Sequence, residues 1–271
     1  MSNPDAATTS GAASGKALQT VKQRSAPNAI KLFSGWFCPY AQRAWIALEA
    51  KQIDYEYVEV NPYEKPKELL DINPRGLVPA LKHNDFNLYE SLIIVDYIDE
   101  AFPSHPFLPP LSPSTVRLRA TTRFWANHID KIIPAGFIGI LLNQEHEKQA
   151  EAAQNLLTTI KEFAENALGK TNPDGGLFLP SEELSLVDIT FAPFAIRFEI
   201  VLKHYRGFSV PDGPELAWKR YAKWVEAIKK HPAVAATLSD SERYLQSYQR
   251  YADGTAQSKA AQAVRGGKTI Y

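Results

Sequence analysis

Cysteine is almost absent from this chain, because Cys38 is the only one among 271 residues. A single cysteine excludes a framework of internal disulfides. It is typical of proteins that work in a reducing compartment, so we expect a cytoplasmic protein. Any disulfide that Cys38 forms must join it to another molecule.

An excess of one charge and a long apolar segment are missing too. The 30 basic and 30 acidic residues balance, which gives no reason to expect nucleic acid or an anionic membrane as a partner. The longest strongly apolar run, residues 135–142, is far shorter than the ~20 residues that cross a bilayer. The six histidines show no metal-ligand spacing. We therefore expect a soluble protein without a bound metal.

The distribution of proline and small polar residues divides the chain. Its first residues are rich in Ala, Ser, Thr and Gly without a hydrophobic period, which predicts disorder. A mitochondrial presequence is the weaker alternative, because Asp5 and the lack of an amphipathic arginine pattern oppose it. The expected parts are a disordered tail over 1–27, an α/β domain over 28–102, a Pro-rich linker over 103–113, a helical domain over 114–251 and a polar C-terminal tail over 252–271.

The first domain alternates strands and helices. The expected elements are a strand over 29–34, a helix over 39–51, a strand over 55–60, a short helix over 66–71, strands over 77–81 and 87–89, and a helix with Ser91 as N-cap. This order predicts an α/β domain of the thioredoxin type. All later patterns are helical, over 114–133, 144–168, from 185 onward, 214–230 and 232–251, which predicts an all-α second domain.

Cys38 stands where the first strand turns into the first helix. Gly35 permits a turn and Pro39 suits the first helical position, so Cys38 is expected at the helix N-terminus. The helix dipole and unpaired N–H groups there stabilise a thiolate, which predicts a reactive cysteine with a lowered pKa. Ala41 occupies the place of a second redox cysteine. A buried, inert cysteine is the alternative.

Four segments together resemble the cytosolic glutathione transferase superfamily and follow one another in the same order as in that family. The resemblance extends over residues 29–250. The segment around Cys38 resembles the omega class, whose catalytic residue is a cysteine where other classes use serine or tyrosine. The remaining segments are similar to the family's cis-proline segment, its glutamate-serine pair and its second-domain capping box. The four segments are residues 37–43, 73–81, 89–91 and 185–188.

The resemblance implies a glutathione site around a mixed disulfide between Cys38 and glutathione. Val78 would pair its backbone with the cysteinyl part of glutathione beside a cis Pro79. The residues implied to contact glutathione are Phe37, Tyr40, Lys65, Val78, Pro79, Glu90 and Ser91. Simpler roles stay open: a helix cap at Ser91, a solvated Lys65 and a trans edge proline at Pro79.

Residues for a second substrate are suggested only by position. Trp36 flanks the thiol in sequence, and Trp125 and His128 lie on the first helix of the second domain, which faces the cleft in the resembled family. Aromatic residues at helical spacing also suit a core. Ser185 and Asp188 form a capping box and are expected to be structural.

The leading hypothesis is a glutathione-dependent thiol transferase that removes glutathione from mixed disulfides. The omega resemblance adds reduction of dehydroascorbate and of aromatic glutathione thioethers, and a homodimer. Glutathione is the expected co-substrate. A glutathionyl-hydroquinone reductase and a non-catalytic glutathione-binding interaction module remain the alternatives.

Overall fold

Within residues 11–257 and 262, which the structure describes, four strands form one sheet in the order β2-β1-β3-β4. In this computed structural model β1 pairs with β2 in parallel and with β3 antiparallel, and β3 pairs antiparallel with β4. The bounds are β1 (Ile30–Ser34), β2 (Glu56–Glu59), β3 (Ala80–His83) and β4 (Phe86–Tyr89).

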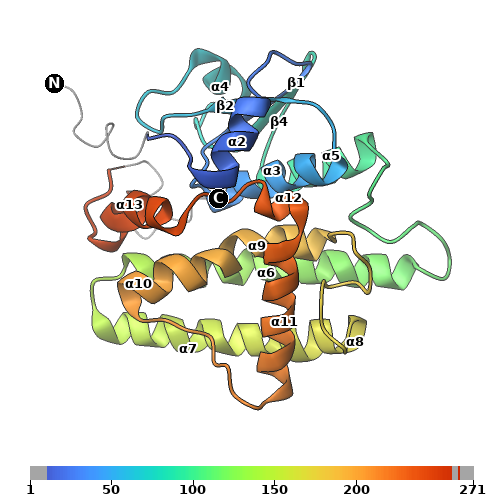
Figure 1. Cartoon of the computed structure of the whole chain (residues 1–271), viewed down its shortest axis with the longest axis vertical. Coiled ribbons are helices and arrows are strands. Elements are labelled where there is room, and N and C mark those ends of the chain that lie inside the picture. Colours follow the sequence, from blue (N-terminus) through green and yellow to red (C-terminus); the bar gives the residue numbers. More distant parts are fainter. Residues whose placement is uncertain (1–10, 258–261, 263–271) are drawn as a thin grey trace.

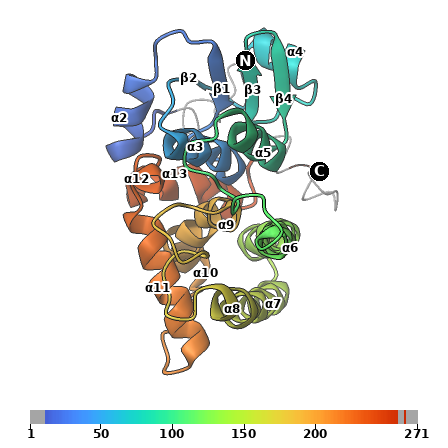
Figure 2. The same cartoon turned by 90° about the vertical axis from the view of Figure 1, so that its right-hand side faces the viewer.

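The alternation of side chains along the strands builds two apolar layers. Leu32 of β1 joins the main core with α3 (Pro39–Lys51) and α5 (Ser91–Ala101). Phe33 instead packs in a smaller core with α4 (Lys67–Ile72) on the other face. Figure 2 shows α3 and α5 between the sheet and the helical domain. The predicted thioredoxin-like domain is confirmed.

The helical domain surrounds one apolar helix, α9 (Leu186–Arg197), in which every residue is buried. The apolar sequence of this helix explains its burial. Two long helices, α6 (Val116–Leu142) and α7 (His146–Glu162), pack side by side below α9 (Figure 1), and α11 (Leu216–Lys230) packs against α9 and α7. The predicted all-α second domain is therefore confirmed.

Three predicted helix bounds were wrong. The α6 helix continues past residue 133 and through Pro134, because Phe137, Ile140 and Leu141 beyond it are buried in the core. The helix expected over 144–168 ends in a π-helix, η1 (Phe163–Leu168), followed by the short α8 (Gly169–Thr171). The helix expected over 232–251 is two helices, α12 (Pro232–Ala235) and α13 (Ser241–Ala252). A second π-helix, η2 (Phe198–Leu202), and α10 (Lys203–Arg206) follow α9.

The expectation of a disordered tail over 1–27 was wrong for its second half. Residues Gly15–Gln23 form α2, although residues 1–10 lie outside the described part. Ala17 donates its N–H to Leu238 O at 3.0 Å, and Thr20 donates its hydroxyl to Ala236 O at 2.8 Å. Small buried side chains therefore dock this polar helix beside α12, without the apolar period that sequence patterns detect.

The far end of the chain is also partly ordered. Ala252 ends α13 and Ala256 is buried, so the expected polar tail over 252–271 begins with packed residues. Apart from Gln262, residues beyond 257 lie outside the described part.

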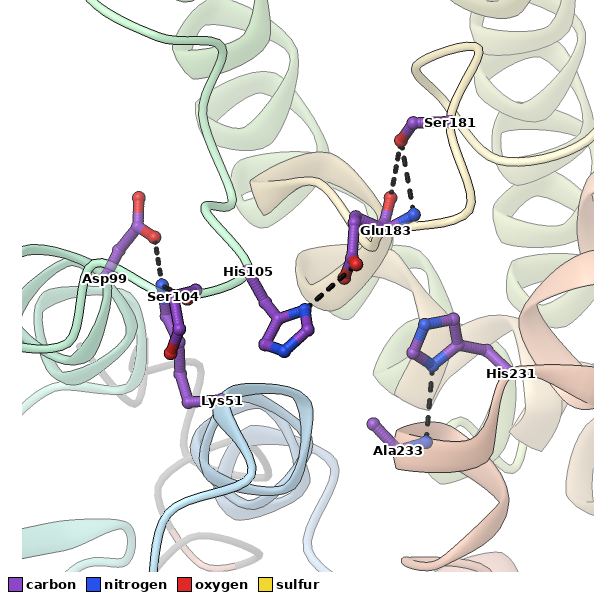
Figure 3. A network of polar contacts seen from close by, with 8 residues as sticks. All are labelled: Lys51, Asp99, Ser104, His105, Ser181, Glu183, His231 and Ala233. Carbon is purple, nitrogen blue, oxygen red and sulfur yellow. Dashed lines mark hydrogen bonds and ion pairs between the residues drawn. The ribbon is translucent and has the colours of Figure 1, made fainter.

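Residues 103–113 join the two domains without helix or strand and are held from both sides. Lys51 Nζ, at the buried end of α3, lies 2.7 Å from Asp99 Oδ1 and 2.8 Å from Ser104 O. On the other side His105 Nδ1 lies 2.9 Å from Glu183 Oε1 of the helical domain (Figure 3). No helix within the described residues is long and apolar enough to cross a membrane.

Candidate active site

Cys38 occupies the N-cap of α3, as predicted, with Pro39 at the first helical position. Its N–H donates to Gly35 O at 2.8 Å, which closes the turn after β1. Its carbonyl accepts the N–H of Gln42 at 3.0 Å and begins the helical hydrogen bonds. The cysteine is partly buried and is not fully exposed on the protein surface.

The thiol faces the segment that leads into β3. Cys38 Sγ lies 4.0 Å from the carbonyl oxygen of Val78, and the Val78–Pro79 peptide bond is cis, as the resemblance implied. A trans edge proline is thereby excluded at this position. The sulfur and the Val78 backbone thus share one side of the site.

The environment of the Cys38 thiol does not lower its pKa as the sequence predicted. The N–H of Ala41 and the charges of Arg197 and Arg43 lower the pKa of Cys38, but burial is the larger effect and raises the pKa above its ordinary value. The predicted lowered pKa was therefore wrong. Helix geometry favours a thiolate, whereas the surrounding protein removes the solvent that stabilises one.

A cleft opens beside the thiol segment. Glu90 is the N-cap of α5 with a φ of 77°, a conformation that side chains other than glycine rarely adopt and that is typical of functional sites. Ser91 is the first helical residue rather than the predicted N-cap, and its hydroxyl accepts from Arg43 Nη1 at 3.3 Å. The cleft is lined by Tyr40, Asn73, Arg75, Leu77, Val78, Pro79, Glu90 and Ser91.

Arg75 is a charged member of this cleft that the sequence did not identify. Its guanidinium forms an ion pair with Glu90 and lies 5.7 Å from the ring centroid of Tyr89. Both side chains are nearly half exposed, so their charges are accessible to solvent. In the sequence, only the position of Arg75 in the turn before Val78 could have indicated that it lines the cleft.

Lys65 lies against the same turn. Gly76 has a φ of 63°, and a Cβ built on it would stand 3.0 Å from Lys65 Nζ. The lysine side chain therefore covers Gly76, two residues before Val78. Its contact with glutathione stays a prediction.

Phe37 and Trp36 are held by the protein itself. The Phe37 carbonyl accepts from Arg197 Nη2 at 2.8 Å and from the hydroxyl of Tyr248 at 2.9 Å. Trp36 is 1% exposed and donates its Nε1–H to Gly11 O at 2.9 Å, so its prediction as a pocket residue was wrong. It packs in the core because the turn at Gly35 directs it beneath α13, against Tyr244.

The other residues suggested for a second substrate belong to the helical domain. Trp125 is 9% exposed and packs on Phe163 with ring centroids 6.3 Å apart, so it is a core residue and its assignment to a pocket was wrong. His128 is partly buried and stacks on the exposed ring of Phe124. Its role as a substrate contact stays a prediction.

Arg197 and Tyr248 are further residues that sequence analysis missed. They come from α9 and α13 of the helical domain, 160 and 211 positions from Phe37, and both reach its carbonyl. No local pattern indicates such a contact, because it depends on how the two domains pack.

The capping box at Ser185 and Asp188 forms as predicted and is structural. Asp188 N donates to Ser185 Oγ, and Asp188 Oδ2 accepts from Ser185 N at 2.8 Å. Asp188 Oδ1 accepts from Trp224 Nε1 at 2.7 Å and from Phe178 N at 2.9 Å. Across residues 11–257 and 262, no group of three or more His, Cys, Asp or Glu side chains could hold a metal ion.

Comparisons with known proteins identify relatives of this chain. The N-terminal domain of glutathione S-transferases matches residues 32–106. Glutathione S-transferase U28 of Arabidopsis thaliana is 35% identical over 213 residues, which are 78% of this chain and 89% of that protein. Glutathione S-transferase L1 of the same plant is 31% identical and matches 82% of this chain and 86% of its own length.

Solved structures give the same result. Glutathione transferase Omega 3C from Trametes versicolor is 39% identical, with a TM-score of 0.76, and the match covers 91% of this chain and 100% of that one. Rice GST1 in complex with glutathione is 30% identical, with a TM-score of 0.71, over 81% of this chain and 96% of that one. Sequence and fold together show that this chain belongs to the glutathione S-transferase family.

Proposed function

We propose that this protein is a cysteine-type, omega-like glutathione-dependent thiol transferase. The observation that carries the proposal is the position of Cys38 at the N-terminus of α3, 4.0 Å from Val78 O and beside the cleft that ends at Glu90 and Ser91. The 39% identity to an omega-class structure supports it.

The chemistry consists of two exchanges at one sulfur. Cys38 loses its proton to solvent, and its thiolate attacks the glutathionyl sulfur of a mixed disulfide. The S–S bond of the substrate breaks, the substrate thiolate leaves and takes a proton from solvent, and Cys38 becomes glutathionylated. The thiolate of a second glutathione then attacks this disulfide, which releases oxidised glutathione and the Cys38 thiolate.

The cleft residues suit a tripeptide with charged ends. Glu90 is a carboxylate for the γ-glutamyl ammonium, and the N-terminus of α5 at Ser91 offers N–H groups to the γ-glutamyl carboxylate. Val78 offers its backbone to the cysteinyl part, and Lys65 offers a charge to the glycyl carboxylate. Tyr40 lines the same cleft, whereas Phe37 contributes by fixing the loop.

Mass spectrometry of the intact protein tests the covalent step. After exposure to oxidised glutathione we expect a gain of one glutathionyl group on Cys38, reversed by a thiol reductant. Cys38→Ser is the matched control and should gain none. An unmodified wild-type protein would contradict the proposal.

Turnover separates the proposal from its alternatives. With glutathione and a small mixed disulfide we expect continuous release of oxidised glutathione, which a non-catalytic interaction module would not produce. Parallel assays with dehydroascorbate and a glutathionyl-hydroquinone identify the preferred substrate. Loss of conjugating activity in Cys38→Ser together with retained disulfide reduction would contradict the assignment of Cys38.

We also propose a homodimer. Four large apolar side chains are exposed on β4, α5 and α6, which lie on one side of the molecule in Figure 2: Phe86, Tyr89, Ile93 and Phe124. A second copy of the chain would bury them. Light scattering should give twice the mass of one chain for the wild type and for the control Leu111→Asp, but a monomer for Ile93→Asp. A monomeric wild type would contradict the homodimer.

The lone cysteine favours a cytoplasmic location, since its chemistry needs reduced glutathione. Cell fractionation with antibodies to the untagged protein tests this, and recovery in a membrane or organelle fraction would contradict it.

A further inference from the structure

Arg197 is a residue of the helical domain, and its positive charge lies beside the loop that holds Cys38. Its side chain is fully buried. Nη2 donates to Phe37 O at 2.8 Å, one residue before Cys38, and Nη1 donates to Gln42 Oε1 at 2.6 Å, one helical turn after it. The guanidinium therefore touches the catalytic loop on both sides of the cysteine.

No carboxylate compensates this charge among the residues that the structure describes. The remaining partners of Arg197 are the Pro193 carbonyl, the Tyr248 hydroxyl and the face of the Tyr244 ring, whose centroid is 4.9 Å from Cζ. Other buried cations of this chain do have acidic partners: Arg43 pairs with Asp130 and Lys51 pairs with Asp99. A buried cation without a counterion is costly, so it favours an anion nearby.

Cys38 is the nearby group that can become that anion. Its interaction with Arg197 raises the pKa of the arginine and lowers the pKa of the thiol. Arg43 acts in the same direction, but its charge is shared with Asp130. Tyr248, which also faces the thiol, stays neutral because burial raises its pKa.

One acidic group opposes these cations. Glu59, the last residue of β2, accepts the N–H of Trp36 at 3.3 Å and the hydroxyl of Tyr57 at 2.9 Å. Its side chain reaches solvent, but the protein around the carboxyl raises its pKa to about 7. In its charged form Glu59 raises the pKa of Cys38.

We propose that Arg197 is a positioning residue that acts through Cys38, as the counter-charge of its thiolate, and that Glu59 opposes it. This deepens the proposed function and rests on it. Whenever Cys38 attacks or leaves a disulfide, the sulfur carries a negative charge, and Arg197 then gains the anion that it otherwise lacks. Because the arginine belongs to α9, its stabilisation of the thiolate depends on the packing of the two domains.

The rate of alkylation of Cys38 by iodoacetamide as a function of pH tests this without glutathione. For Arg197→Gln we expect the midpoint of the pH profile to rise by about one unit, a roughly tenfold slower reaction at pH 7. Arg197→Lys keeps the charge and should stay close to the wild type. Arg206→Gln is the matched control, because Arg206 is a partly buried arginine on backbone carbonyls that has no contact with the Cys38 loop.

Glu59→Gln tests the opposing effect of the Glu59 charge on the Cys38 thiolate, at an exposed position. It removes a negative charge, so the midpoint should fall by up to about one unit. An unchanged midpoint in this variant, or in a folded Arg197→Gln, would overturn the proposal. So would an Arg197→Lys as slow as Arg197→Gln, because the role of Arg197 would then be purely structural. Turnover of the wild type is measured separately, so a failure of the proposed function is recognised independently.

Discussion

At the scale of single residues, the site combines a favourable backbone with an unfavourable environment. Cys38 has the helix N-terminus that stabilises a thiolate, yet burial raises the pKa of its thiol. Glu90 is held at a φ of 77° by the turn before α5, and this directs its carboxylate toward Arg75 and the cleft. Backbone strain of the kind seen at Glu90 is typical of functional sites.

The pKa of the wild-type thiol should lie above the ordinary value for cysteine, because burial raises it. Because only the thiolate reacts with iodoacetamide, the rate should rise about tenfold per pH unit from pH 6 to pH 8 and level off at higher pH. N-acetylcysteine, measured beside it, provides the unperturbed profile. A plateau already reached at pH 7 would contradict the dominance of burial.

Replacing Glu90 by Gln should raise the KM for glutathione about tenfold, because a charge-assisted hydrogen bond to the γ-glutamyl ammonium is lost. The kcat should change little, since Cys38 and its surroundings are untouched. Glu226→Gln, an exposed glutamate on α11, is the control and should leave KM unchanged. Equal KM values for wild type and Glu90→Gln would exclude this contact.

At the scale of elements, short local signals determine where helices begin. Pro39 begins α3, and the capping box begins α9. The Asp188 carboxylate also accepts from Phe178 and Trp224, so it joins α9 to the preceding loop and to α11. Helix ends are less local: α6 continues through Pro134 because the residues beyond it are buried.

Asp188→Ala should lower the free energy of unfolding by about 3 kcal/mol or more, because it leaves several buried N–H groups without an acceptor. Urea denaturation followed by circular dichroism measures this. Glu242→Ala, an exposed acidic residue in the first turn of α13, is the control and should cost about 0.5 kcal/mol or less. Equal losses in both variants would contradict the bridging role of Asp188.

At the scale of the whole molecule, the site is built where two domains meet. The first domain supplies Cys38, Val78 and Glu90, and the second supplies Arg197 and Tyr248 behind the Cys38 loop. α3 and α9 are in direct contact, and Arg43 of α3 donates to Thr190 O of α9 at 2.9 Å. The connecting segment is held by the buried Lys51, as Figure 3 shows.

Lys51→Met should lower the free energy of unfolding by about 3 kcal/mol, because Asp99 loses the cation of a buried ion pair. The linker carbonyl at Ser104 loses its donor as well. Lys67→Met removes an exposed ion pair with Asp71 and should cost no more than about 0.5 kcal/mol. Thermal denaturation of the two variants side by side decides this, and an equally stable Lys51→Met would refute it.

Much of the site was predictable because its signals are local. Cys38 at its helix start and the capping box depend on neighbouring residues, whereas the cis Val78–Pro79 bond was implied only by the family resemblance. Trp36 and Trp125 were misassigned because a core and a pocket select the same aromatic side chains. The helix over Gly15–Gln23 was missed because it docks through two small residues.

The sequence by itself determined the thioredoxin-like domain, the helical domain and the position of a single sulfur at a helix N-terminus, since periodicity, proline and caps act over a few residues. Only the tertiary structure decided the electrostatics of that sulfur. Burial depends on every segment packed around Cys38, and Arg197 reaches its loop from 160 positions away. Long-range packing therefore sets the pKa of a residue whose location was already evident from its neighbours.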